Sequence, residues 1–571
     1  MEANSCPELS PMRHNGFKDL FLDIVTAQME PRRNRFFSIT QFREPPIKVL
    51  SSAACKELEI KLHEAASEKT FIDISTASLM QLQDICIEAM KCLEFVRESE
   101  PPANEFTTLI VDTLSSSRIA LLLISLKPET LALQSENVLR LSLRSLSSVL
   151  SGTHEAASPI WDEATRTLKA LNRIATKVGL DVVLPELEEF VVRIIHPSFR
   201  DSILGTTNRN NVNALTDSAM DLTLSIFLQY SDERSPLTAA AVSIAMVDAR
   251  TRQNCHTALR NKKSIRRSSL LFVSFVDLYI LPTGTAQSVS PSNAQEARQC
   301  LEAAERFAQQ IVSSLLAIDQ SPQSRFSTLQ VLCEDLVQIV RSPEGMGAEV
   351  LLRCLLHCML KLANDSRSRH CPSLLALQLL RTMGEAIAYL YAFVQGAATA
   401  EQKKDLYGPT GVYRSVINYI QLNARHNIHT GAARAYLIAV CAHNAFKDTS
   451  RSDEEINTSN EWLEKVMDGP PVPESFYETS SCHQVWPKQV MTAYLITLLS
   501  TNFFQGLERI FFVMRDGLEN NSVIIRLKSW KGLIGICNNN RSILRQTTGL
   551  VAGCLSDPSA KVREAALISL L

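Results

Sequence analysis

The chain has 571 residues, with 58 Lys and Arg against 60 Asp and Glu, so its formal net charge is −2. Its length exceeds what a single hydrophobic core supports and predicts several domains or one elongated repeat array. The balanced charge excludes attraction of nucleic acid or membranes by net charge, so any such contact requires a local patch. Glycine is scarce, with 19 residues, and the apolar runs are rich in Leu, Ala and Ile, which favours helices over sheets.

The 14 cysteines are scattered and form no CxxC pair, and the first residues show no signal-peptide pattern. We therefore expect reduced thiols and an intracellular protein. No apolar run reaches the roughly 18 residues that span a bilayer, so we expect no membrane contact. Motifs for nucleotide, zinc-protease and serine-hydrolase chemistry are absent, so we expect no enzyme, no cofactor and no metal site.

Residues 1–50 combine Pro, Arg and Asn with little periodicity, which predicts a loosely ordered segment. From about residue 57, apolar residues recur at steps of three and four, the spacing of one helical face. The clearest stripe consists of Leu79, Leu82, Cys86, Met90 and Leu93. No stretch shows sustained period-two alternation, so we place no strand and predict an all-α fold. Its first part is an N-terminal helical domain at 51–280.

The strongest charge feature is the segment 248–269, which carries seven cations and one acid, Asp248. The cations that we expect to bind DNA are Arg260, Lys262, Lys263, Arg266 and Arg267. Between two apolar helices, such side chains can contact phosphates without reading sequence. The alternative is a solvated basic loop, or cations that offset the charge of helix C-termini. Phosphorylation within the RRSS stretch would reverse the local charge.

A middle helical array is expected at 296–447, followed by a loop-rich insertion at 448–483. The segment GMGAEV at 345–350 lacks the third glycine of a dinucleotide fingerprint and follows no strand, so we interpret it as a helix-start turn. Thiol and imidazole groups also gather in this array, at Cys354, His357, Cys358, His370 and Cys371. Zinc ligands normally converge from turns, whereas Cys in a Leu-rich stripe behaves as a small hydrophobe, so core packing is predicted.

The segment 484–571 contains a repeat. The stretches 518–533 and 555–570 align without a gap, a period that is typical of an α-solenoid built from helix pairs. The repeat positions are Asn520, Arg526, Asp557 and Arg563. We expect Asp557 to N-cap the second helix, with Pro558 at its first position. Arg526 and Arg563 are predicted to bridge neighbouring repeats and not to bind DNA.

The chain ends on Leu570 and Leu571, inside an apolar stripe, whereas a repeat array needs a polar terminal cap. We therefore expect the HEAT-type repeats of 484–571 to be truncated at the C-terminus, and the chain to be the N-terminal portion of a longer protein.

Three stretches resemble the cohesin loader family, also known as Nipped-B-like proteins or adherins. The most specific is LSDPSAKVREAA at 555–566 behind RSILRQTTGLVAGCL, which is similar to a family segment with Ser-Ile-Leu and then Val-Arg-Glu-Ala. Within it, LRQTT and DPS depart from the family pattern. The other two are AEVLLRCLLHCMLKLANDSRS at 348–368 and the region 58–94 followed by SSRIALLLISL. Their order is that of the family, so the resemblance covers about 57–571.

This resemblance implies a HEAT-repeat scaffold that binds cohesin subunits and DNA, the latter without sequence specificity. It also implies stimulation of the cohesin ATPase and loading of cohesin onto chromatin in the nucleus, for sister chromatid cohesion. The family holds a tetratricopeptide-repeat partner through an extended N-terminal segment, for which residues 1–50 are short. The alternative is a generic HEAT-repeat adaptor in transport or trafficking, without a DNA role.

Overall fold

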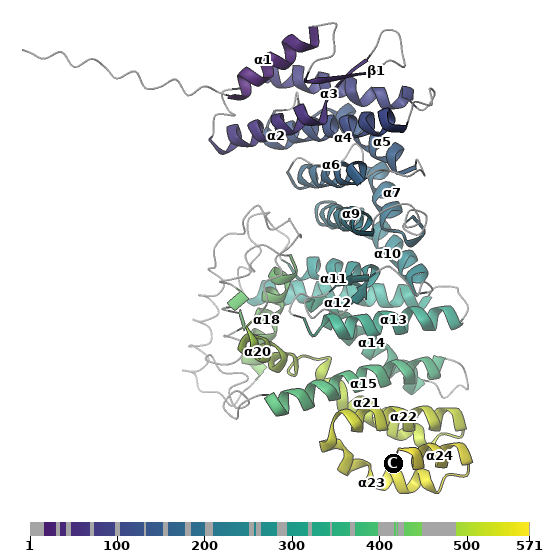
Figure 1. Cartoon of the computed structure of the whole chain (residues 1–571). Helices are drawn as coiled ribbons and strands as arrows, with labels where there is room; N and C mark the ends of the chain where they lie inside the picture. Colours follow the sequence, from purple (N-terminus) through teal and green to yellow (C-terminus); the bar gives the residue numbers. More distant parts are fainter. Residues whose placement is uncertain are drawn as a thin grey trace, which may run out of the picture. The chain divides into compact units, whose positions relative to one another are not determined.

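The computed structural model describes residues 16–29, 35–40, 47–68, 74–96, 103–130, 133–151, 158–177, 184–199, 209–249, 256–258, 264–281, 294–317, 322–342, 345–365, 372–397, 416–417, 419–420, 428–447 and 487–569. The chain divides into two compact units, Met1–Glu233 and Arg234–Leu571. Both consist mainly of helices (Figure 1), which confirms the predicted all-α class.

The elements of the first unit are α1 (Gly16–Met29), β1 (Phe37–Thr40), β2 (Ile47–Leu50), α2 (Ser52–Ser67), α3 (Thr76–Val96), α4 (Ala103–Leu126), α5 (Glu136–Ser151), α6 (Ser158–Lys177), α7 (Leu184–Ile195) and α9 (Arg209–Gln229). Helices α3, α4, α6 and α9 pack each against the next, as successive layers (Figure 1). Each layer therefore buries the apolar stripe of its neighbour, which is the packing expected of stacked helices.

Helix α4 is the centre of this unit and carries an unusual buried polar stretch. Arg118 is 3% exposed; its Nε donates to Glu163 Oε2 of α6 at 3.1 Å, and its Nη1 pairs with Glu59 of α2. Burial lowers the pKa of Arg118, but the carboxylates of Glu163 and Glu59 outweigh it and raise that pKa. Because a buried cation needs paired acceptors, this cluster fixes α2, α4 and α6 in one arrangement.

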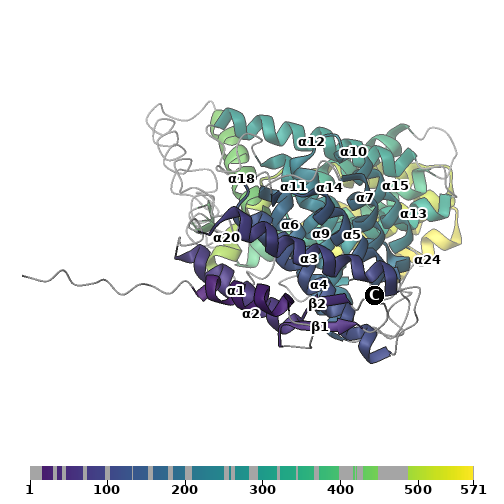
Figure 2. The ribbon, with the colours of Figure 1, turned by 90° about the horizontal axis from the view of Figure 1, so that it is seen from above.

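Residues 1–50 contain more structure than expected. Helix α1 buries Phe17, Leu20, Ile24 and Ala27, and β1 pairs with β2 in an antiparallel hairpin. The hairpin lies beside α3 and α4 (Figure 2). Ser38 Oγ donates to Asp112 Oδ2 of α4 at 2.6 Å, a contact 74 residues apart that local periodicity cannot show.

By length and composition alone, the described part of the chain holds one helix that could cross a membrane, Glu105–Leu126 in α4. This run does not stand out in the sequence because Asp112 and Arg118 interrupt it. Of its most apolar window, 89% is buried inside the fold. That burial is typical of the core helix of a globular unit.

The elements of the second unit are α10 (Arg234–Asp248), β3 (His256–Ala258), β4 (Ser264–Arg266), α11 (Arg267–Ile280), α12 (Ala294–Ala317), α13 (Pro322–Ile339), α14 (Met346–Asp365), α15 (Pro372–Ala397), α18 (Ile428–Lys447), α20 (Lys488–Leu498), η5 (Phe504–Gly506), α21 (Leu507–Asp516), η6 (Gly517–Glu519), α22 (Val523–Asn539), α23 (Arg541–Leu555) and α24 (Ala560–Ile568). Helices α11, α12 and α14 pack together, and α18 packs against all three. Helix α15 contacts both α14 and α22, and α22 contacts α23 and α24.

The segment 345–350 begins α14, as the sequence predicts. Gly347 N donates to Asp277 Oδ1 of α11 at 2.7 Å. A Cβ at Gly347 would lie 2.6 Å from Val273 O, so only glycine allows α14 to start this close to α11. Asp277 is fully buried and its other oxygen pairs with His429 Nδ1 of α18 at 2.7 Å. One carboxylate thus joins three helices.

Two features of this unit differ from the sequence-based expectations. Strands β3 and β4 form a short antiparallel pair beside α11, where the sequence analysis placed no strand. Helices α10 and α11, which the expected domain at 51–280 includes, belong to the second unit by their contacts. The periodicity of α10 resembles that of its predecessors, so the sequence carries no signal for this boundary. The expected insertion at 448–483 lies outside the described residues.

Candidate functional site

The predicted DNA-binding cations divide into two groups. Arg266 is held at the end of β4: its Nη1 lies 3.6 Å from Asp335 Oδ2 of α13, and its backbone N donates to the same oxygen at 3.2 Å. The side chain of Arg267 is 4% exposed. Arg260, Lys262 and Lys263 lie between Ala258 and Ser264, outside the described residues.

Asp335 fixes the point where this basic segment enters α11. Its Oδ2 also accepts from Ser269 Oγ at 2.7 Å. Burial raises the pKa of Asp335, while the hydrogen bond from Ser269 and the charge of Arg266 oppose that rise. Arg266 is therefore paired within the fold and Arg267 is buried. A phosphate contact by this segment would depend on Arg260, Lys262 and Lys263.

The four repeat positions lie at the junction of α22 and α24. Arg526 Nε and Nη2 donate to the two oxygens of Asp557, at 2.7 and 2.9 Å, so the pair is bidentate. Arg526 Nη1 also donates to the carbonyls of Asn520 and Asn521. Arg563 Nη1 makes the equivalent bonds to Asp557 O and Pro558 O. The side chain of Arg526 is 12% exposed, so its guanidinium is engaged in joining two repeats.

The expected N-cap at Asp557 is corrected by the structure. The N-cap of α24 is Ser559 and that of α22 is Ser522. Asp557 Oδ1 accepts from Ser559 N at 2.7 Å, and Asn520 Oδ1 accepts from Ser522 N at 2.9 Å. Both residues thus form Asx-type turns before the helix. Oδ1 of Asp557 accepts from Arg526 Nη2 as well as from Ser559 N, and Oδ2 accepts from Arg526 Nε.

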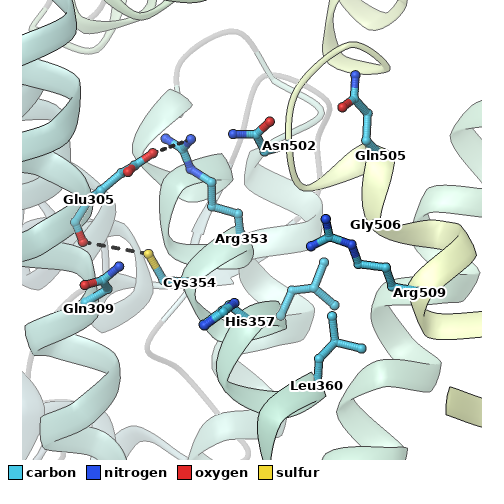
Figure 3. Close-up of a pocket in the computed structure, with 11 residues that line it drawn as sticks. Glu305, Gln309, Arg353, Cys354, His357, Leu360, Asn502, Gln505, Gly506 and Arg509 are labelled. Atoms are coloured by element: carbon cyan, nitrogen blue, oxygen red, sulfur yellow. Dashed lines mark hydrogen bonds and ion pairs between the residues drawn. The ribbon is translucent and has the colours of Figure 1, made fainter.

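A cavity of about 380 Å³ lies within the second unit, and the sequence analysis did not predict it. It is lined by Glu305, Gln309, Arg353, Cys354, Leu356, His357, Leu360, Asn502, Gln505, Gly506 and Arg509. These residues come from α12, from α14, from the segment that links α20 to α21 and, for Arg509, from α21 itself (Figure 3). They are separated by up to two hundred positions in the sequence, so no local motif marks the cavity.

The wall of the cavity is a buried charge network. Arg353 Nη1 lies 2.5 Å from Glu305 Oε1, and Nε lies 3.5 Å from Glu349 Oε2. Burial lowers the pKa of Arg353, but the carboxylates of Glu349 and Glu305 outweigh it and raise that pKa. Arg353 therefore stays charged.

Glu349 connects this network to two further elements. Its side chain is fully buried. Tyr436 OH of α18 donates to Glu349 Oε2 at 2.7 Å, and Phe503 N donates to Glu349 Oε1 at 3.0 Å. Gly506 lies three residues after Phe503 and packs against α14, where a Cβ would clash with Leu356 Cδ2. The link between α20 and α21 is thus held tightly against α14, which fixes the rim of the cavity.

The thiols and imidazole at 354–358 do not converge. Cys354 is buried and its Sγ donates to Glu305 O at 3.8 Å, while His357 on the same helix is exposed. Burial raises the pKa of Cys354 to about 12, so the thiol is not a ready metal ligand. His370 and Cys371 lie outside the described residues. Among the residues that are described, no group of three or more His, Cys, Asp or Glu is placed to hold a metal ion.

The stacked helices define an α-solenoid of the HEAT type, as the sequence predicts. No family model and no curated protein sequence matches the chain. Among solved structures, the chain is similar to the cohesin loader SCC2, C-terminal fragment, of Chaetomium thermophilum, with a TM-score of 0.77 and 18% identity. The match covers 97% of this chain and 48% of that one, so the chain spans about half the length of that fragment. Kap121p matches with a TM-score of only 0.18 at 12% identity.

The similarity to the SCC2 fragment confirms, at the level of the fold, the resemblance to the cohesin loader family that the sequence indicates. At 18% identity the similarity shows a shared fold and does not identify residues that contact partners.

Proposed function

We propose that the chain is a non-enzymatic scaffold of the cohesin-loader type, which binds cohesin subunits and DNA and promotes loading of cohesin onto chromatin. The observation that supports this most is the SCC2-like fold over 97% of the chain. A solenoid presents extended surfaces to large partners, so its mechanism is to hold them together and not to make or break bonds. Stimulation of the cohesin ATPase, a nuclear location and a role in sister chromatid cohesion belong to the same proposal.

The proposed DNA contact is the group Arg260, Lys262 and Lys263, which binds phosphates without reading bases. Arg266 and Arg267 are left out of the proposed contact because Arg266 pairs with Asp335 and Arg267 is buried. A short basic segment that precedes α11 in the sequence supplies local positive charge that the net charge of −2 hides.

The DNA proposal is tested with the variant R260E/K262E/K263E and a fluorescent duplex of mixed sequence. We expect weaker binding and a shallower dependence of affinity on salt, because up to three phosphate contacts are lost. The matched control is K488E/K531E/K561E, which reverses three exposed lysines of the same unit and changes the net charge equally. Equal affinity and equal salt slopes for the two variants would remove this segment as the DNA contact.

The loader proposal is tested by binding to purified cohesin and by the rate of ATP hydrolysis with and without the chain. We expect co-purification with cohesin and a faster ATPase in the presence of DNA. A chain that binds neither cohesin nor DNA would favour the generic adaptor. The expected tetratricopeptide-repeat partner is tested separately, by comparing the full chain with one that starts at residue 51.

A further inference from the structure

The cavity between α12, α14 and the link before α21 shares no lining residue with the proposed DNA contact. Its volume of about 380 Å³ falls in the range of ligand-binding pockets, about 300–1,000 Å³. Most of its lining is polar, which disfavours a purely apolar ligand. The charge balance and the hydrogen-bonding groups of the wall indicate what fits there.

Positive charge prevails on the wall. Two guanidinium groups, Arg353 and Arg509, line the cavity against one carboxylate, Glu305, and that carboxylate is bound to Arg353 Nη1. Arg353 Nη2 is buried and has no hydrogen-bond partner among the described residues. Arg509 is exposed and extends from α21 toward α14 (Figure 3). A buried N–H without an acceptor is costly, so an anionic acceptor at this point would be stabilised.

Side-chain amides supply the remaining polar groups. Gln309, Asn502 and Gln505 line the cavity and are exposed. An amide offers both a donor and an acceptor, which is the pattern of a peptide backbone. Gln505 Nε2 donates to Ser500 O at 3.0 Å, which orients its Oε1 as an acceptor. The amides stand on both sides of the two arginines, so they suit an extended chain that crosses the cavity.

We propose that this cavity binds an extended acidic peptide segment of a partner protein. One Asp or Glu side chain of the peptide lies between the guanidinium groups of Arg353 and Arg509, and the amides of Gln309, Asn502 and Gln505 bond its backbone. Duplex DNA is the less fitting ligand, because its phosphates lie on a rod too wide to enter a recess of this volume. The site stands on the geometry of the second unit alone, whether or not the chain loads cohesin.

The test selects a random-peptide display library on the full chain, with counter-selection on R509E. Arg509 is exposed and lies outside the buried network, so R509E should fold as the parent does. The matched control is R515E on the same helix, where Arg515 pairs with its neighbour Asp516 and lies over the ring of Phe512. Selected peptides are then synthesised and titrated by calorimetry into the parent chain, R509E, N502A and R515E.

We expect selected peptides to carry an Asp or Glu whose replacement by Asn or Gln weakens binding about tenfold. R509E should weaken the same peptides about tenfold or more, N502A less, and R515E should leave affinity unchanged. The proposal is overturned if no peptide distinguishes the parent chain from R509E, or if those that do lack acidic residues. Binding of a duplex oligonucleotide that is lost in R509E, without any peptide binding, would overturn it as well.

Discussion

The C-terminal repeats and the cavity wall of the second unit use the same pair of groups, an arginine and a carboxylate, in different settings. Between α22 and α24, Arg526 and Asp557 meet near the surface, and Arg563 repeats the bonds that Arg526 makes to backbone carbonyls. At the cavity, Arg353 faces two carboxylates from α12 and α14, one of them fully buried. The carbonyl bonds of the first arrangement recur with the repeat, whereas the second arrangement occurs where unlike helices meet.

The two kinds of contact are constrained differently in a solenoid. Repeat contacts have to recur, because each pair of helices must cover the next, so their residues are constrained at fixed spacing. At a junction of unlike helices, buried polar groups have to pair with one another but do not have to recur at a fixed spacing, so a polar wall and a cavity can form there. The predictions below test whether the second kind of contact is the more costly to break.

The largest effect is expected for E349A. It removes the acceptor of Tyr436 OH and Phe503 N and leaves Arg353 with one carboxylate. Breaking a buried ion pair by removing one partner costs about 3–5 kcal/mol, so the second unit should unfold at markedly lower urea concentration. E349Q keeps the shape and one acceptor oxygen, but its NH2 replaces the other acceptor and the charge is lost, so its effect should fall between those of the parent and E349A. Hydrogen exchange at α14 and at 501–509 should rise first, and equal unfolding of E349A and the parent would contradict the network.

A smaller effect is expected for D557N. The amide keeps the turn to Ser559 N but loses the charge opposite Arg526, so we expect a loss of about 1 kcal/mol. A double-mutant cycle with R526Q isolates the pair, and its coupling energy should account for most of that loss. A coupling energy near zero would mean that the bridge contributes only geometry.

The same bridge predicts a pH dependence. The hydrogen bond from Arg526 lowers the pKa of Asp557 below its ordinary value of 3.8. A lowered pKa gives stability that is present above pH 3.8 and is lost as pH falls through the pKa of the folded protein. The difference in unfolding between the parent and D557N should therefore be constant from pH 8 to 5 and shrink below pH 4, as checked by urea titrations at each pH.

Sequence reasoning reached the fold and the repeat but not the cavity. Apolar spacing and the match of Arg526 with Arg563 are local signals, so helices and repeat positions could be found. Arg353 and Asn502 are distant in sequence, and only the packing of α14 against the link before α21 brings them together. The burial of Arg267 could not be predicted from the sequence either. A cation in a basic stretch is expected to be exposed unless the packing of the neighbouring helix is known.

A carboxylate that faces another carboxylate should behave in the opposite way to Asp557. Glu188 of α7 lies beside Glu233. Partial burial, a hydrogen bond with Glu233 and the charge of Glu233 raise the pKa of Glu188 from 4.5 to about 7. Stability is then greatest below pH 4.5 and is lost as pH rises through 7. E188Q should unfold like the parent near pH 4.5 but at higher temperature than the parent at pH 8. E189Q on the same helix controls for net charge, and a pH-independent difference for E188Q would contradict the pairing.

The smallest effect is expected for N520D, which gives the first repeat the residue that the second repeat has. Asn520 Oδ1 already accepts from Ser522 N, so an added carboxylate gains no new hydrogen bond there. Arg526 contacts Asn520 through the backbone carbonyl and not through the side chain, and its Nε and Nη2 donate to Asp557. We therefore expect a change within about 0.5 kcal/mol, measured by urea unfolding beside D557N. A stabilisation as large as the loss in D557N would show that the charge at this position acts without an arginine from a neighbouring repeat.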